Sequence, residues 1–335
     1  MNLSLAMPFF LTTLISGSIL SISSLSWFSA WIGLELNLMS FIPLLTIKMN
    51  PYSSEASIKY FLIQALGSTV IIMSSAMLLS LPNQLPYFLI LFALLLKLGA
   101  APFHLWFPQV MEGLTWPQSI ILLTVQKLAP MFLISLLMDS WIMKQVLIFA
   151  AILSAIVGAL GGLNNMKLRK IMAFSSINHM SWMLIAISMN HMLWILYFSF
   201  YFFISSSVIM MFYYMKAFTM SNIMNISNFN PLYKLMFPMS LLSLGGLPPF
   251  SGFIPKWLMV QMMVAENLFI PLFFMLSSAL ITLYYYLRII IPFILLFNPM
   301  LTFRKKTLPY SSISFTTIFS LNSLGMCLPL FFTLQ

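Results

Sequence analysis

Long runs of apolar residues, separated by short polar segments, follow one another along the whole chain. A helix needs about 20 mostly apolar residues to cross the hydrocarbon core of a bilayer. This pattern predicts eleven transmembrane spans, at residues 5–25, 27–47, 57–80, 86–106, 116–137, 142–162, 168–188, 192–215, 235–266, 269–291 and 312–333. The ninth span is too long for one plain helix and is rich in glycine and proline between 245 and 255, so we expect two half-helices joined by a break.

Composition supports a membrane protein over a water-soluble one. Hydrophobic residues make up 61% of the 335 and charged residues only 6%, whereas soluble domains have about 45–50% apolar and 25% charged residues. No polar linker or charged tail divides the chain. We therefore predict an all-α polytopic membrane protein, with a single membrane domain over residues 1–335.

The distribution of basic residues indicates how the spans are oriented. The odd-numbered gaps between spans hold only Lys144, and Arg288 lies near the even-side end of span ten. The even-numbered gaps, taken together with the first three residues of the spans that follow them, hold Lys48, Lys59, Lys167, Arg169, Lys170, Lys216, Lys234, Arg304, Lys305 and Lys306. Because short loops on the cytoplasm-like side carry an excess of Lys and Arg, we expect the N-terminus there and the C-terminus on the opposite side. The basic residues form no patch with interleaved aromatics, so no nucleic-acid partner is expected.

Four acidic or basic side chains fall inside predicted spans and away from the three or four residues at each span end: Glu35, Lys97, Lys127 and Lys256. Such a group costs roughly 2.5–3.5 kcal/mol on membrane-insertion scales and is a functional-site hypothesis by default. Glu35 is the acid deepest within a span, so it is the natural partner of the lysines in proton transfer. A structural ion pair is the alternative for Glu35, and snorkelling toward water is the alternative for Lys256. Lys127 lies farthest from any expected helix break.

Histidines and prolines extend this picture. His104 and His179 could lengthen a proton relay, since a neutral imidazole both donates and accepts a hydrogen bond; a capped helix end is the alternative for His104. Each lysine also lies close to a proline, and a proline inside a helix leaves the carbonyl four residues earlier without its donor. We therefore expect small hydrated pockets near Pro102, Pro130 and Pro255.

A sequence pattern occurs twice in the chain. Residues 96–108 and 242–255 share L-x-L-G-x-x-P-F-x4-P once one inserted proline is allowed. The first copy ends the fourth span and the second breaks the ninth, so each would be the fourth member of a five-helix unit. Because five is odd, the second unit would enter the membrane from the opposite side, as in the inverted repeats of transporters. We assign 1–140 to the first repeat, 141–292 to the second, and 293–335 to a linker and a final helix.

Several cofactor sites are excluded by residue counts and motifs. Cys327 is the only cysteine, so the chain can build neither an internal disulfide nor a four-cysteine iron–sulfur site. There is no phosphate-binding loop, no dinucleotide-binding glycine motif and no His/Cys metal spacing. We expect no cofactor in this chain, and any redox chemistry to occur elsewhere.

Six motifs carry a resemblance to a known family, at residues 31–37, 54–64, 96–104, 126–130, 168–179 and 244–257. They closely resemble the motifs of the animal NADH–ubiquinone oxidoreductase chain 2 family. Members of this family are mitochondrially encoded, antiporter-like membrane subunits of respiratory complex I. In that family the positions of Glu35, Lys97, Lys127 and Lys256 are assigned to proton half-channels and a central hydrophilic axis.

The resemblance implies a non-redox subunit of a proton-translocating NADH:ubiquinone reductase. It implies the mitochondrial inner membrane, with the N-terminus in the matrix and the C-terminus in the intermembrane space. Its implied partners are other complex I subunits, including neighbouring antiporter-like chains, and membrane lipids. NADH, FMN, iron–sulfur clusters and ubiquinone would be bound elsewhere in the complex. The alternative is a free-standing cation/proton antiporter of the same ancestry.

Overall fold

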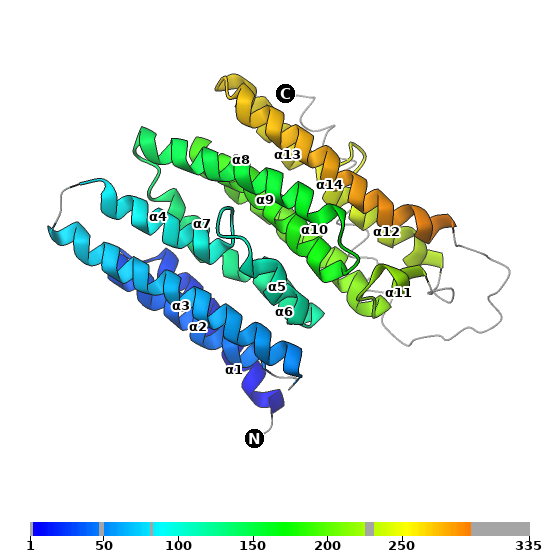
Figure 1. Cartoon of the computed structure of the whole chain (residues 1–335), viewed down its shortest axis with the longest axis horizontal. Coiled ribbons are helices and arrows are strands. Elements are labelled where there is room, and N and C mark those ends of the chain that lie inside the picture. The colour runs from blue at the N-terminus through cyan, green and yellow to red at the C-terminus, as the bar shows by residue number, and fades with distance from the viewer. Residues whose placement is uncertain (1–2, 47–49, 81–82, 225–230, 296–335) are drawn as a thin grey trace. The chain divides into compact units, whose positions relative to one another are not determined.

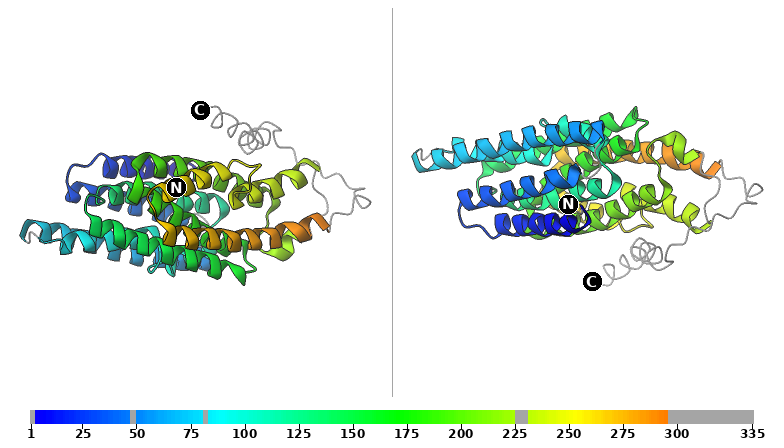
Figure 2. Two further views of the ribbon diagram at one scale, coloured as in Figure 1. Left: turned by 90° about the horizontal axis from the view of Figure 1, so that it is seen from above. Right: turned by 90° about the horizontal axis from the view of Figure 1, so that it is seen from below.

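The computed structural model describes residues 3–46, 50–80, 83–224 and 231–295, and these residues are mostly helical (Figure 1, Figure 2). Within this part of the chain there is no β-strand beyond one isolated bridge between Lys167 and Thr219. The predicted all-α fold is therefore confirmed. The chain forms two compact units, Met1–Ser154 and Ala155–Gln335, and the division between them falls within helix α8 (Trp141–Leu163).

Close helix packing organises unit 1. Its helices are α1 (Leu3–Ile22), α2 (Trp27–Leu45), α3 (Pro51–Ser80), α4 (Leu85–Leu98), α5 (Trp106–Gly113), α6 (Trp116–Leu123), α7 (Val125–Ser135) and the first part of α8. Helix α1 packs along α2, and α3 contacts α2, α4 and α5 (Figure 1). A Cβ atom at Gly33 would lie 2.6 Å from the backbone nitrogen of Ser21, so α1 and α2 approach this closely only because residue 33 is glycine.

Unit 2 is built around one central helix. Its helices are α9 (Leu168–Met189), α10 (His191–Met215), α11 (Met220–Met224), α12 (Pro231–Gly245), α13 (Phe253–Ala265) and α14 (Phe269–Leu295). Helix α9 contacts α10, α13 and α14 and is buried on nearly every side. Many of its buried residues are polar. Burial of a polar group costs free energy unless the group forms a hydrogen bond.

The loops that carry basic residues in unit 2 meet at one end of it. The bridge between Lys167 and Thr219 joins the segments before α9 and after α10. Arg288 of α14 donates from Nη1 to the carbonyl of Leu163 at 2.7 Å. We call this region the basic end of unit 2; its basic residues are Lys167, Arg169, Lys170, Lys216 and Arg288.

The predicted spans within the described residues coincide with helices or interrupted helices. Seven helical segments are long and apolar enough to cross a membrane, and shorter apolar helices occupy Met7–Ile22, Leu85–Leu98, Met236–Gly245 and Phe253–Ala265. The break expected in the ninth span is present between α12 and α13. The eleventh predicted span, 312–333, lies outside the described residues.

Two details of the predicted spans are wrong. The fourth span was predicted to reach residue 106, but α4 ends at Leu98 and a separate helix, α5, begins at Trp106. The fifth span is interrupted at Thr124, between α6 and α7, where φ is −118° and ψ is −78°. The Thr124 hydroxyl donates to the carbonyl of Ile120 at 2.6 Å, a local bond by which threonine competes with regular helical geometry.

Candidate functional site

Both copies of the repeated pattern end a helix in the same way. After α4, Gly99 has a φ of 69°, and the N–H of Ala100 donates to the carbonyl of Leu95 at 3.1 Å. After α12, Gly246 has a φ of 77°, and the next N–H donates to the carbonyl of Leu242 at 3.3 Å. A left-handed residue followed by such a bond is the Schellman cap, which favours glycine. The glycines of the motif therefore stop two helices in the middle of long apolar stretches.

Side chains satisfy the carbonyl groups that the end of α4 exposes. The indole Nε1 of Trp106 donates to the carbonyl of Leu96 at 3.1 Å, and Nε2 of Gln64 donates to the carbonyl of Lys97 at 3.1 Å. Backbone groups inside a bilayer need such partners because lipid supplies none. Lys97 itself lies in the last turn of α4 and is buried, at 6% exposure. The negative end of the helix dipole favours a cation at this position.

Lys127 lies beside the unexpected break in the fifth span. It occupies the first turn of α7, three residues after Thr124, and is only 2% exposed. Its ammonium lies 5.3 Å from the centre of the Phe107 ring, within the range of a cation–π interaction. The expectation that Lys127 lies far from any helix break is therefore wrong. Pro130 lies inside α7, as the sequence predicted.

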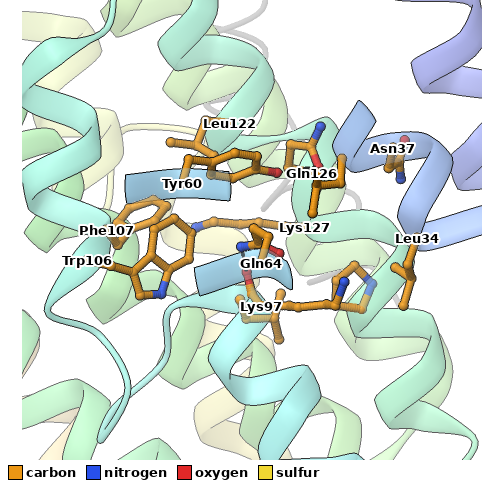
Figure 3. A pocket seen from close by; sticks show the side chains of 13 residues that line it. Leu34, Asn37, Tyr60, Gln64, Lys97, Trp106, Phe107, Leu122, Gln126 and Lys127 are labelled. Carbon is orange, nitrogen blue, oxygen red and sulfur yellow. Dashed lines mark hydrogen bonds between the residues drawn. The ribbon is translucent and has the colours of Figure 1, made fainter. Parts of the chain in front are cut away.

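Lys97 and Lys127 line a small cavity within unit 1 (Figure 3). In this view Lys127 extends toward Phe107, whereas Lys97 extends toward the side of Leu34 and α2. The volume open to the centre of a water molecule is about 20 Å³, which suffices for about one water. The lining consists of Leu34, Asn37, Leu38, Tyr60, Gln64, Lys97, Leu98, Trp106, Phe107, Leu122, Gln126, Lys127 and Pro130.

Neutral polar groups make this cavity suitable for water. The Tyr60 hydroxyl donates to Oε1 of Gln126 at 3.2 Å. Nε2 of Gln126 and Oδ1 of Asn37 are buried and have no hydrogen-bond partner among the described residues. A water needs several polar partners, and these two groups are a donor and an acceptor. Sequence reasoning missed Tyr60, Gln64 and Gln126, although amides within apolar spans were the available signal.

Glu35 lies on α2, and Lys97 is the buried lysine on which its charge acts. Its carboxylate acts electrostatically on Lys97, but the two side chains do not form a salt bridge. Oε2 of Glu35 is buried without a hydrogen-bond partner in the described part of the chain.

His104 lies apart from this cavity. It is half-buried in the link between α4 and α5, near Pro102, and is not among the lining residues. Pro102 follows the end of α4, so the prediction that it frees a helical carbonyl is wrong. The same holds for Pro255, the third residue of α13, because a proline in the first turn removes no intrahelical bond.

The side chain of Lys256 extends from α13 across the helix break to the end of α12, and not toward water. It belongs to the first turn of α13, is 9% exposed, and donates from Nζ to the carbonyl of Gly245 at 2.8 Å. Gly245 is the last residue of α12. Lys256 thus caps the negative end of that helix, where a cation is favoured. Snorkelling does not describe its position.

His179 lies in the middle of α9 and is buried. Its Nδ1 lies 3.0 Å from the hydroxyl of Tyr197 on α10. A second small cavity, with about 10 Å³ open to the centre of a water, borders His179, Tyr197, Ser243 and Pro255, the neighbour of Lys256. Within the described residues, no group of three or more His, Cys, Asp or Glu side chains could hold a metal ion.

The chain is similar in sequence to a known family of membrane proteins over most of its length. The model of the NADH:quinone oxidoreductase/Mrp antiporter transmembrane family matches residues 24–282. NADH-ubiquinone oxidoreductase chain 2 of Anopheles gambiae is 50% identical over 288 residues, covering 84% of this chain and 83% of the relative. The same protein of Locusta migratoria is 37% identical over 327 residues, covering 96% and 91%.

Solved structures share the fold at low sequence identity. A chain of respiratory complex I from Thermus thermophilus with bound aureothin matches with a TM-score of 0.79 at 22% identity, covering 95% of this chain and 76% of that one. A chain of the Mrp complex from Dietzia sp. DQ12-45-1b matches with a TM-score of 0.74 at 17% identity, covering 84% and 59%. The family model and the close insect relatives together show that this chain belongs to the NADH-ubiquinone oxidoreductase chain 2 family of antiporter-like membrane subunits.

Proposed function

We propose that this chain is a membrane subunit of the proton-translocating NADH:ubiquinone oxidoreductase of mitochondria, and that it moves protons without a redox centre of its own. The observation that carries the proposal is the burial of Lys97, Lys127 and Lys256 beside interrupted helices. A purely structural scaffold has no need of three such residues, since each is costly to insert. The relatives described above are named as chain 2 of NADH-ubiquinone oxidoreductase, which supports the proposal.

Unit 1 supplies the elements of a proton site. In a desolvated environment an ammonium is costly, and a nearby carboxylate reduces that cost. Movement of Glu35 toward or away from Lys97 would therefore change whether that lysine holds its proton. Water in the cavity that both side chains line would provide the link between Lys97 and Lys127. Lys256 is the corresponding proton carrier of unit 2, where withdrawal from the Gly245 carbonyl would accompany loss of its proton.

The surroundings of the chain follow from this function. The protein resides in the mitochondrial inner membrane, with its basic loops and N-terminus in the matrix and its C-terminus in the intermembrane space. Neighbouring antiporter-like chains and lipids contact it. Other subunits bind NADH, FMN, the iron–sulfur clusters and ubiquinone. A free-standing antiporter is the competing function, and purification distinguishes them, because only the subunit co-purifies with a flavin and iron–sulfur arm.

The test is Glu35→Gln, measured in the intact complex in vesicles. The amide keeps the size and hydrogen bonding of the side chain but cannot alternate between charged and neutral forms. We expect normal assembly and a fall of about tenfold or more in NADH-driven proton transfer, as for loss of a proton-transfer group. Glu266→Gln is the matched control, because Glu266 is exposed at the end of α13. Normal proton transfer in the Glu35 variant would refute the role of Glu35.

A further inference from the structure

Unit 2 contains a set of buried hydroxyl groups that the lysine sites do not use. Four tyrosines and two serines are each at most 4% exposed. They are Tyr197 and Tyr201 on α10, Tyr285 and Tyr286 on α14, and Ser175 and Ser176 on α9. Together with His179 we call them the hydroxyl ladder. A buried phenol is costly without a hydrogen-bond partner, so an apolar core would be served better by phenylalanine.

Helical spacing brings these side chains together. Ser175 and His179 are four residues apart on α9, and Tyr197 and Tyr201 are four apart on α10, so each pair shares one helix face. Helix α9 contacts both α10 and α14. The ladder therefore draws on three neighbouring helices of the same unit.

The contacts run in an order along α9. His179 Nδ1 lies 3.0 Å from the Tyr197 hydroxyl, and the His179 and Tyr201 rings are 5.2 Å apart. One turn earlier on α9, Ser176 interacts with Tyr201 and Ser175 interacts with Tyr286.

The last members of the ladder are two adjacent tyrosines. The ring centres of Tyr285 and Tyr286 are 4.8 Å apart. The hydroxyls of both are buried and have no fully formed hydrogen bond within the described residues. A small side-chain movement, or one water, would complete the connections.

The ladder joins two places of different character. At one end, His179 and Tyr197 border the small cavity that also touches Pro255, next to Lys256. At the other end, Tyr285 packs against Gly162, where an added Cβ would lie 2.6 Å from the ring. Arg288, three residues after Tyr285, binds the neighbouring carbonyl of Leu163 at the basic end of unit 2.

We infer that the hydroxyl ladder is a proton relay between the basic end of unit 2 and His179. Each hydroxyl accepts a proton on its oxygen and releases its own to the next oxygen, so no net charge remains on any member and no oxidant or reductant is required. This inference rests on the proposed function, because it supplies a route by which protons reach the buried groups of unit 2.

The test removes single hydroxyls from the intact complex. Tyr286→Phe and Tyr197→Phe keep ring volume and remove only the O–H. Tyr284→Phe is the matched control, because Tyr284 is adjacent on α14 but 61% exposed. We expect normal assembly, a fall of about tenfold in NADH-driven proton transfer for the two ladder variants, a larger slowing in D₂O than wild type shows, and no change for Tyr284→Phe.

Ser175→Ala covers the case in which a tyrosine variant fails to assemble. Alanine favours the helix more than serine does, so slow proton transfer in this variant reports the lost hydroxyl and not a weaker helix. Wild-type rates of proton transfer in Tyr286→Phe and Tyr197→Phe would refute the proposed relay. If those two variants do not assemble, wild-type rates in Ser175→Ala would refute it. Glu35→Gln in the same assay separates the two proposals: if it is impaired while the ladder variants are normal, the ladder fails and the proposed function stands.

Discussion

Lys127→Met is the variant for which the structure gives the clearest expectation. Methionine keeps an unbranched apolar chain of similar length and removes the titratable amine. The contact of the ammonium with the Phe107 ring, 5.3 Å away, is lost; a desolvated cation–π interaction of this kind contributes about 2 kcal/mol. Removal of the buried charge relieves roughly 2.5–3.5 kcal/mol. The second effect is the larger, so the variant should be about 0.5–1.5 kcal/mol more stable in the membrane.

Although Lys127→Met should stabilise the protein, it should lower its activity. If Lys127 carries protons across the cavity of unit 1, its loss blocks one step of a coupled machine, and both proton transfer and ubiquinone reduction should fall. The assay measures both rates in vesicles and normalises them to the amount of assembled complex. Lys59→Met is the control, because the Lys59 side chain is 41% exposed, does not line the cavity and forms an ion pair with Glu55 at 2.6 Å.

Two results would refute this reasoning. Wild-type values for both rates would show that Lys127 is a bystander. Loss of assembly would show that its contacts stabilise unit 1 by more than the cost of its burial, which would return Lys127 to a structural role.

Further predictions concern topology and packing. Labelling reagents applied from the matrix should reach loops 163–170 and 298–311, whereas Gln335 should react only from the intermembrane space. Loop 298–311 and Gln335 lie outside the described residues. Labelling of Gln335 from the matrix would contradict the eleven-span topology. Gly33→Ala places a Cβ 2.6 Å from a backbone atom of α1, so it should cost about 1–3 kcal/mol and reduce the assembled complex on native gels. Gly245→Ala is its control, since the nearest atom would be 3.6 Å away, and equal yields of the two variants would contradict the packing argument.

Sequence reasoning was most successful where one physical requirement dominates. Bilayer thickness fixes the length of a spanning helix, so most of the helices follow the apolar runs within a few residues, the fourth and fifth spans being the exceptions. The break between α12 and α13 was predictable because Gly246 and the following prolines cannot continue a helix. Lys97, Lys127 and Lys256 stood out because charge is rare in apolar spans, and the structure buries all three.

The features that were missed depend on tertiary contacts. Nothing in the sequence near Thr124 resembles a helix stop, since neither glycine nor proline occurs there; the break became visible only from backbone geometry. Pro102 and Pro255 were interpreted as helix-interior residues, and the observed helix ends place both where no helical bond is lost. Tyr60 and Gln126 meet across 66 positions of sequence, a separation that periodicity cannot resolve.

The central claim is that buried lysines of unit 1 lie on a hydrated proton path, and water in the cavity between them tests it most directly. The measurement is a density map of the intact complex at a resolution that shows ordered water. We predict density for a water in the cavity that Lys97 and Lys127 line, within hydrogen-bond distance of at least one of its polar side chains. A dry cavity in such a map, with ordered water visible elsewhere at similar depth in the membrane, would contradict the account.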